Sequence, residues 1–302
     1  MFGILALPIA EVIIVGALLG IVGSLAILGN RVFFAESLSH GTFPGAVLGV
    51  VLGQFLGGDL SVWLFVGAAV FCIPLALLMR YLTSLTGISA TAAAGIVLTL
   101  GYALGVFLLR WFQPLPLKVE GFLTGSLLTV SHADVAIAAG VGVGAVVSWV
   151  LFGRRLVLYY FDPVAFVVSV RDARWWLAVV EGVTLGLLCA SMVVAIPAVG
   201  SILAIALLVA PAAGVQVLVS DFRQLVIWSG VAGIGIGAVG LTVAVYWSLS
   251  AGGTIAVTAG LFYLSCRLLG WVLCMSWNTP KKPKTISNAS GILASEPASP
   301  LR

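Results

Sequence analysis

Apolar residues run through this chain in long continuous stretches, separated by short polar segments. A helix needs about 20 predominantly apolar residues to cross a bilayer. Because the stretches are continuous and do not alternate with polar residues, they predict helices and not the strands of a membrane barrel. We expect about nine transmembrane helices (8–10), at residues 4–28, 37–56, 60–79, 89–109, 133–152, 176–196, 199–219, 224–249 and 254–275.

The composition supports a membrane location. The chain has 302 residues, of which 62% are hydrophobic and 8% charged, whereas soluble domains carry about 25% charged residues. The fold class expected is therefore an all-α integral membrane protein. The membrane domain should occupy 1–277, and the polar tail 278–302, rich in Pro, Ser and Lys, should be disordered.

The positive charges predict the orientation in the membrane. If the loops after the first, third, fifth and seventh spans and the C-terminal tail share one side, that side holds 12 of the 14 Lys and Arg residues. Only Arg110 and Lys118 lie on the other side. Because Lys and Arg concentrate in cytoplasmic loops, the N-terminus should lie outside and the C-terminus inside. The basic residues sit at span ends, so they do not indicate nucleic-acid binding. The cytoplasmic set is Arg31, Arg80, Arg154, Arg155, Arg171, Arg174, Arg223, Arg267, Lys281, Lys282, Lys284 and Arg302.

Two ionisable residues at the start of the second span suggest a metal site. Glu36 and His40 are four residues apart, so they share one helix face. At 1.5 Å per residue, His40 lies about 13 Å beyond Arg31, near the middle of the membrane. A carboxylate and an imidazole one turn apart can supply half the ligands of a divalent first-row metal. The alternative is a private Glu36–His40 ion pair that stabilises a helix contact.

Two other intramembrane carboxylates, Glu11 and Glu181, lie near predicted span ends. Either snorkelling to the interface or a helix–helix hydrogen bond explains them. The four cysteines lie in apolar stretches without a CxxC motif and are expected to be core residues.

Glycine and proline mark two further features. Glycines recur every fourth residue from 41 to 53, a spacing that lets another helix approach closely, and Pro44 predicts a kink. Pro197, Gly200 and Pro211 interrupt the apolar run 195–214. Irregular backbone at membrane depth is tolerated where it is buried or lines a cavity, although an ordinary kinked helix would also fit.

Two polar segments outside the spans are candidates for contacts. Asp162 and Pro163 can begin a short helix, as N-cap and first residue, within 153–175. It is either an interfacial helix or a docking helix for a cytoplasmic partner. On the outer side, Ser131 or Asp134 can cap the fifth span, and His132 and Asp134 are weak metal-capture candidates.

Three motifs resemble the permease subunits of ATP-binding-cassette importers for manganese, zinc and iron. They are ESLSHGTFPG (36–45), FDPVAF (161–166) and VGSILAIALLVAPAAGV (199–215). The resemblance implies that Glu36 and His40 line the metal path, with Pro44, Pro197, Gly200 and Pro211 shaping it. Glu36 stands where the family usually has Asp, and the segment 250–256 lacks the acid that the family often has there. The residues that would couple to the ATPase are Phe161, Asp162, Pro163, Ala165, Arg171 and Asp172.

The resemblance also implies the partners. The chain would be no enzyme itself, because it lacks the GxxxxGK[ST] motif that binds nucleotide phosphates. A separate pair of cytoplasmic ATPase subunits, a second permease subunit, identical or related, and an extracytoplasmic metal-binding protein would complete the importer in a bacterial inner membrane. Apart from lipid and the transported ion, no cofactor or nucleic acid is expected. Two alternatives remain open: a permease for a metal chelate such as a siderophore or cobalamin, and a secondary transporter driven by an ion gradient.

Overall fold

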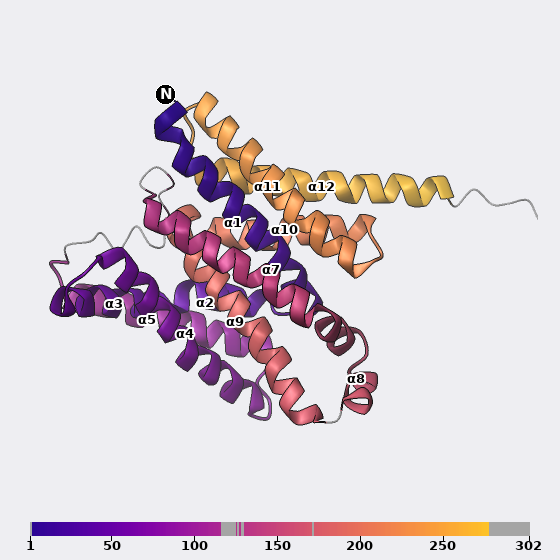
Figure 1. The fold of residues 1–302 in the computed structure, drawn as a ribbon, viewed down its shortest axis with the longest axis horizontal. Coiled ribbons are helices and arrows are strands. Elements are labelled where there is room, and N and C mark those ends of the chain that lie inside the picture. The colour runs from indigo at the N-terminus through magenta and orange to yellow at the C-terminus, as the bar shows by residue number, and fades with distance from the viewer. Residues whose placement is uncertain (1, 116–124, 126, 128–129, 171, 278–302) are drawn as a thin grey trace, which may run out of the picture.

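The computed structural model describes residues 2–115, 125, 127, 130–170 and 172–277. Every regular element in these ranges is a helix (Figure 1). The helices are α1 (Phe2–Leu28), α2 (Val32–Gly41), α3 (Phe43–Leu56), α4 (Leu60–Ser84), α5 (Ala90–Trp111), α7 (His132–Phe161), α8 (Pro163–Ser169), α9 (Ala173–Val199), α10 (Ser201–Leu218), α11 (Phe222–Tyr246) and α12 (Ala251–Trp277). The predicted tail 278–302 lies outside the described residues.

Eight of these helices are long and apolar enough to cross a membrane, and they match eight of the predicted spans. The prediction of a single helix at 37–56 is wrong, because the chain breaks at Thr42 into α2 and α3. Pro44 lies in the first turn of α3, where it has no amide hydrogen to donate. The two short helices follow one another along α5, so together they occupy the place of the predicted span.

Small residues bring the helices together. On α1, Gly16 lies so close to α11 that a Cβ there would come 2.6 Å from the carbonyl oxygen of Gly233. On α3, Gly45 and Gly49 meet Gly67 of α4 in the same way, which confirms the predicted close contact. Lipid tails are as apolar as leucine, so helices in a membrane gain from this close approach and not from hiding apolar area.

The helices form two groups. In one, α2 to α5 pack on each other; in the other, α1 packs against α7, α9, α10 and α11, and α10 and α11 pack against α12. Figure 1 shows α3, α4 and α5 on one side of the molecule and α11 and α12 on the other. The groups meet mainly where α9 contacts α2 and α4 and where α10 contacts α2, with smaller contacts between α1 and α2 and between α7 and α4. We call this contact the α9 interface.

Helix α7 continues nine residues beyond the predicted end at residue 152. Leu156 is fully buried in this extension, and the guanidinium of Arg155 lies 3.3 Å from the ring centroid of Trp176 on α9. The extension is therefore fixed by tertiary packing, which the bilayer-length argument does not consider. The predicted surface segment 153–175 contains only one short separate helix, α8.

Candidate metal path

His40 lines a cavity at the α9 interface. The cavity has a volume of about 580 Å³ and is bounded by α2, α5, the junction of α9 and α10, and the start of α12. The ring of His40 meets that of Tyr102 edge to face, with 5.9 Å between centroids. The Nδ1 atom of His40 is buried and has no hydrogen-bond partner. A buried nitrogen without a partner is costly, and no described side chain offsets that cost here.

Glu36 lies one turn before His40 on α2 and interacts with it electrostatically. The one ion pair found among the described residues joins Arg31 to Glu181. The private Glu36–His40 ion pair, which the sequence left open, is therefore not formed. Within the described ranges, no group of three or more His, Cys, Asp or Glu side chains could hold a metal ion. Glu36 and His40 thus remain two candidate ligands and not a complete set.

Gly200 lines the same cavity as His40. It is the single residue between α9 and α10, and its φ of 92° suits glycine and few other residues. The predicted break is confirmed here. Pro197 lies inside α9 and Pro211 inside α10, so the second interruption that we predicted, at Pro211, is wrong.

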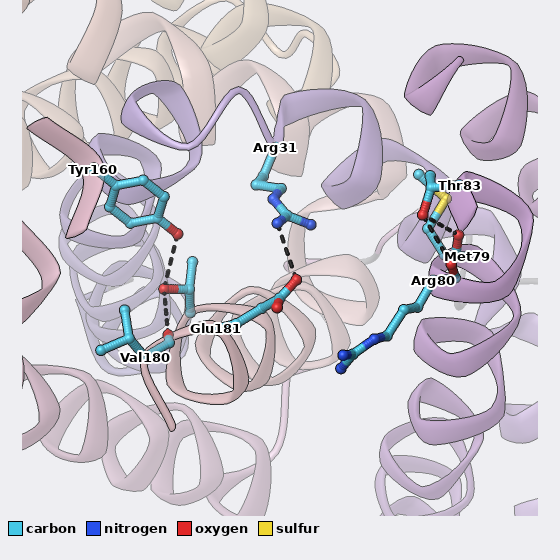
Figure 2. Close-up of polar contacts among 8 residues, drawn as sticks. Arg31, Met79, Arg80, Thr83, Tyr160, Val180 and Glu181 are labelled. Atoms are coloured by element: carbon cyan, nitrogen blue, oxygen red, sulfur yellow. Dashed lines mark hydrogen bonds and ion pairs between the residues drawn. The ribbon is translucent and has the colours of Figure 1, made fainter. Parts of the chain in front are cut away.

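A second cavity lies near the opposite end of the α9 interface. Its volume is about 340 Å³, and its lining includes Arg31, Arg80, Ala76 and Glu181. Nη2 of Arg31 donates a hydrogen bond to Oε1 of Glu181 over 3.1 Å (Figure 2). Arg80 extends into the same space from α4. Two guanidinium groups and one carboxylate leave this lining with a net positive charge.

The Arg31–Glu181 pair confirms a helix–helix hydrogen bond for Glu181. Sequence inspection marked Glu181 as a costly charge but could not identify a partner 150 residues away. Nearby, Tyr160 of α7 donates to Thr184 Oγ1 of α9 over 3.1 Å (Figure 2). Glu11 differs from both expectations: it is 1% exposed, so it does not snorkel, and its Oε2 makes no hydrogen bond.

The short helix α8 lies at the same end of the molecule as this second cavity. As predicted, Asp162 caps it: its Oδ1 accepts a hydrogen bond from the amide of Ala165 over 2.8 Å, and Pro163 is its first residue. Phe166 is fully buried and holds α8 against Tyr159 of α7. Three apolar side chains point outward instead, Phe161 (63% exposed), Val164 (75%) and Val168 (82%).

The remaining candidate residues belong to the segments before α9 and at the start of α7. Arg171 lies outside the described residues, and Asp172 precedes the first turn of α9 without capping it through its side chain. Ser131 and Asp134 form a capping box at the start of α7, with the Asp134 carboxylate accepting from the Ser131 amide over 2.8 Å. The predicted cap is confirmed, and exposed His132 begins the same helix.

Comparison with known proteins places these features in a family. A family model described as the ABC 3 transport family matches residues 1–269. The manganese import system permease protein ScaB of Streptococcus gordonii is 27% identical over 255 residues, covering 83% of this chain and 86% of that protein. The manganese transport system membrane protein MntD of Bacillus subtilis is 29% identical over 272 residues, covering 86% and 90%. The solved structure of PsaBC from Streptococcus pneumoniae in complex with Fab is similar with a TM-score of 0.75 and 26% identity, covering 88% of this chain and 91% of that one.

Proposed function

The chain belongs to the ABC 3 transport family, and on that basis we propose that it is the permease subunit of an ATP-driven importer of divalent transition-metal ions, with manganese(II) as the principal substrate. The observation that carries this proposal is the buried, unpartnered Nδ1 of His40 beside a cavity, with the Glu36 carboxylate one turn away. Carboxylate oxygen suits Mn²⁺, and imidazole suits several first-row metals. The names of the relatives favour manganese over zinc and iron.

The two cavities define the proposed route. The ion enters the His40 cavity from the outer side, near the turn that joins α11 to α12. It leaves through the cavity lined by Arg31, Arg80 and Glu181. Alternating access then consists of opening the α9 interface first on one side of Glu36 and His40 and then on the other. Positive charge on the exit lining disfavours rebinding of the cation there.

The ligand set is completed by other groups in this proposal. A second permease subunit, identical or related, supplies the missing ligands, because one chain provides only two. An extracytoplasmic protein delivers the ion, and the complex lies in the bacterial inner membrane with the N-terminus outside. This orientation follows from the 12 Lys and Arg residues assigned to the cytoplasmic side.

Helix α8 is the proposed docking site for a separate ATPase. Val164 and Val168 are one turn apart on α8, and Phe161 ends α7 beside them. All three side chains are exposed, so they can enter an apolar groove of a partner. The chain itself does not hydrolyse ATP. A Val168→Glu variant should lose co-purification with the proposed partner ATPase, whereas Ser169→Ala should keep it, because the Ser169 hydroxyl bonds only within α8.

The main test is manganese uptake by cells that lack their own importers. Glu36→Ala and His40→Ala should each lower ATP-dependent uptake by at least about tenfold, since even an outer-shell partner of a metal is worth about 10–100-fold in affinity. Ser37→Ala is the control, because its buried hydroxyl bonds only within α2. Membrane insertion and ATPase binding are measured for each variant.

Two results would contradict the proposal. Unchanged uptake in properly assembled Glu36→Ala and His40→Ala variants would remove the metal site. Uptake that persists without ATPase subunits would indicate a gradient-driven transporter. A chelate permease would instead carry a siderophore or cobalamin, and free Mn²⁺ would not compete with that uptake.

A further inference from the structure

Two cysteines face each other across the α9 interface. Cys72 of α4 and Cys189 of α9 lie close enough for their thiol groups to interact where the two helices pack, although 117 residues separate them in the sequence. Cys72 is 4% exposed and Cys189 is partly exposed. Both pack against the same buried cluster. Both are core residues, as predicted, but the sequence did not indicate that they lie together.

The thiol pair lies beside the cavity lined by Arg31, Arg80 and Glu181, which we call the exit cavity. Ala76 follows Cys72 by one turn and Leu185 precedes Cys189 by one turn, and both line that cavity. Four residues of helix correspond to about 6 Å, so the sulfur atoms lie about one turn deeper in the membrane than the cavity lining. Leu75, three residues after Cys72 in the chain, contacts Gly41, which follows His40. The pair thus lies between the two cavities.

We propose that Cys72 and Cys189 form a dithiol site for soft divalent cations such as Cd²⁺. Thiolate sulfur is the ligand that soft metals prefer, whereas Mn²⁺ prefers oxygen. Binding breaks two S–H bonds and forms two S–Cd bonds, and the two protons pass to water in the adjoining cavity. Water or chloride fills the remaining positions around the ion. The site differs in chemistry from Glu36 and His40, so it selects different ions.

Occupancy of this site has a mechanical consequence. Cys72 belongs to the α2–α5 group and Cys189 to the other group. A cadmium ion bound to both sulfurs therefore joins the two groups at the interface that must open during transport. This consequence rests on the proposed function, whereas the binding site itself does not. We expect Cd²⁺ to arrest uptake without occupying the Glu36–His40 site.

Binding is tested on the purified full-length chain in lipid nanodiscs, titrated with cadmium chloride. The unmodified chain should show the ultraviolet charge-transfer absorbance of cadmium thiolate, together with loss of two titratable thiols per chain. Cys72→Ser and Cys189→Ser should each weaken cadmium binding by at least about tenfold, as expected for removal of a direct ligand. Cys72→Ala and Cys189→Ala repeat the test if serine lowers insertion.

Cys266→Ser is the matched control, because Cys266 is also buried in the membrane but lies on α12 against Gly214. It should bind cadmium as the unmodified chain does. If Cys266→Ser removes the signal, or Cys72→Ser and Cys189→Ser leave it unchanged, the proposed site does not exist. Equal partial losses in all three variants would mean scattered binding to single thiols and would equally overturn it.

A second measurement separates this site from the transport site. In cells that take up manganese, excess Mn²⁺ should relieve cadmium competition at Glu36 and His40 but not inhibition through the cysteines. The Cys72→Ser variant should take up manganese normally. Its inhibition by cadmium should be only the part that excess Mn²⁺ relieves. If no chain imports manganese, the proposed function fails while the binding result stands. If the cysteine variants retain the cadmium inhibition that Mn²⁺ does not relieve, the dithiol proposal fails and the proposed transport function stands.

Discussion

The contact between α1 and α11 and the α9 interface are built in different ways. At the first contact, Gly16 and Gly20 of α1 lie directly against the backbone of Ser229 and Gly233. The α9 interface holds two cavities, an ion pair and a thiol pair. Close backbone packing permits little movement, because side-chain rearrangement cannot relieve an overlap with backbone atoms. The proposed alternating access therefore assigns the movement to the α9 interface and leaves the α1–α11 contact unchanged.

The largest expected effect comes from adding one methyl group to the α1–α11 contact. A Cβ at Gly233 would overlap the carbonyl group of Gly16. Gly233→Ala should lower the free energy of unfolding by about 1–3 kcal/mol, the range for overpacked cores. Denaturant titration of the reconstituted protein measures this loss.

The control for that variant is Gly235→Ala on the same helix, where no atom lies within 4 Å of the added Cβ. It should be neutral or slightly stabilising, since alanine favours helix more than glycine does. Equal losses for Gly233→Ala and Gly235→Ala would show that helix propensity, and not the contact with α1, determines the effect.

A smaller effect is expected for the ion pair across the α9 interface. The side chains of Arg31 and Glu181 are 32% and 30% exposed, so solvent weakens their attraction. A double-mutant cycle with Arg31→Gln and Glu181→Gln should give a coupling energy of about 0.2–1 kcal/mol. The charge-swapped double variant, Arg31→Glu with Glu181→Arg, should recover part of this coupling energy. Strictly additive effects would mean that the coupling energy is zero and that the ion pair does not stabilise the α9 interface.

The smallest effect on stability is expected within the exit cavity. Ala76 lines this cavity, so the two methyl groups added by Ala76→Val enter open space. We expect a change in unfolding free energy within about 0.5 kcal/mol. Manganese uptake should nevertheless slow, because the exit narrows. Normal stability with normal uptake would place the exit elsewhere, and a loss as large as that of Gly233→Ala would remove the distinction between the two regions.

The helices were predictable because their signal is local. Length and hydropathy identified eight spans, and the conformational freedom of glycine located the break at Gly200. The division of α2 from α3 was not predicted, although Pro44 indicated a kink, because the exact turn at which a helix breaks depends on its packing. The capping residues Asp162 and Ser131 were recognisable for the same local reason.

The candidate site was only partly predictable. Glu36 and His40 stood out because ionisable groups are rare in apolar stretches. The pairing of Arg31 with Glu181 and of Cys72 with Cys189 depends on how distant helices pack. Tyr102 carries no signal of its own in the sequence, and its contact with His40 appears only in the fold. Sequence alone therefore identified single residues, whereas the structure was needed to group them.

Helix α9 has 27 residues and is about 40 Å long. Its first turn follows the proposed ATPase contact, its middle carries Glu181 and Cys189, and its last residue, Val199, lines the same cavity as His40. A helix is stiff along its axis, so a displacement at one end reaches the other with little loss. In the proposed mechanism, a displacement of α8 would therefore reach the His40 cavity along α9, without a relay of side chains.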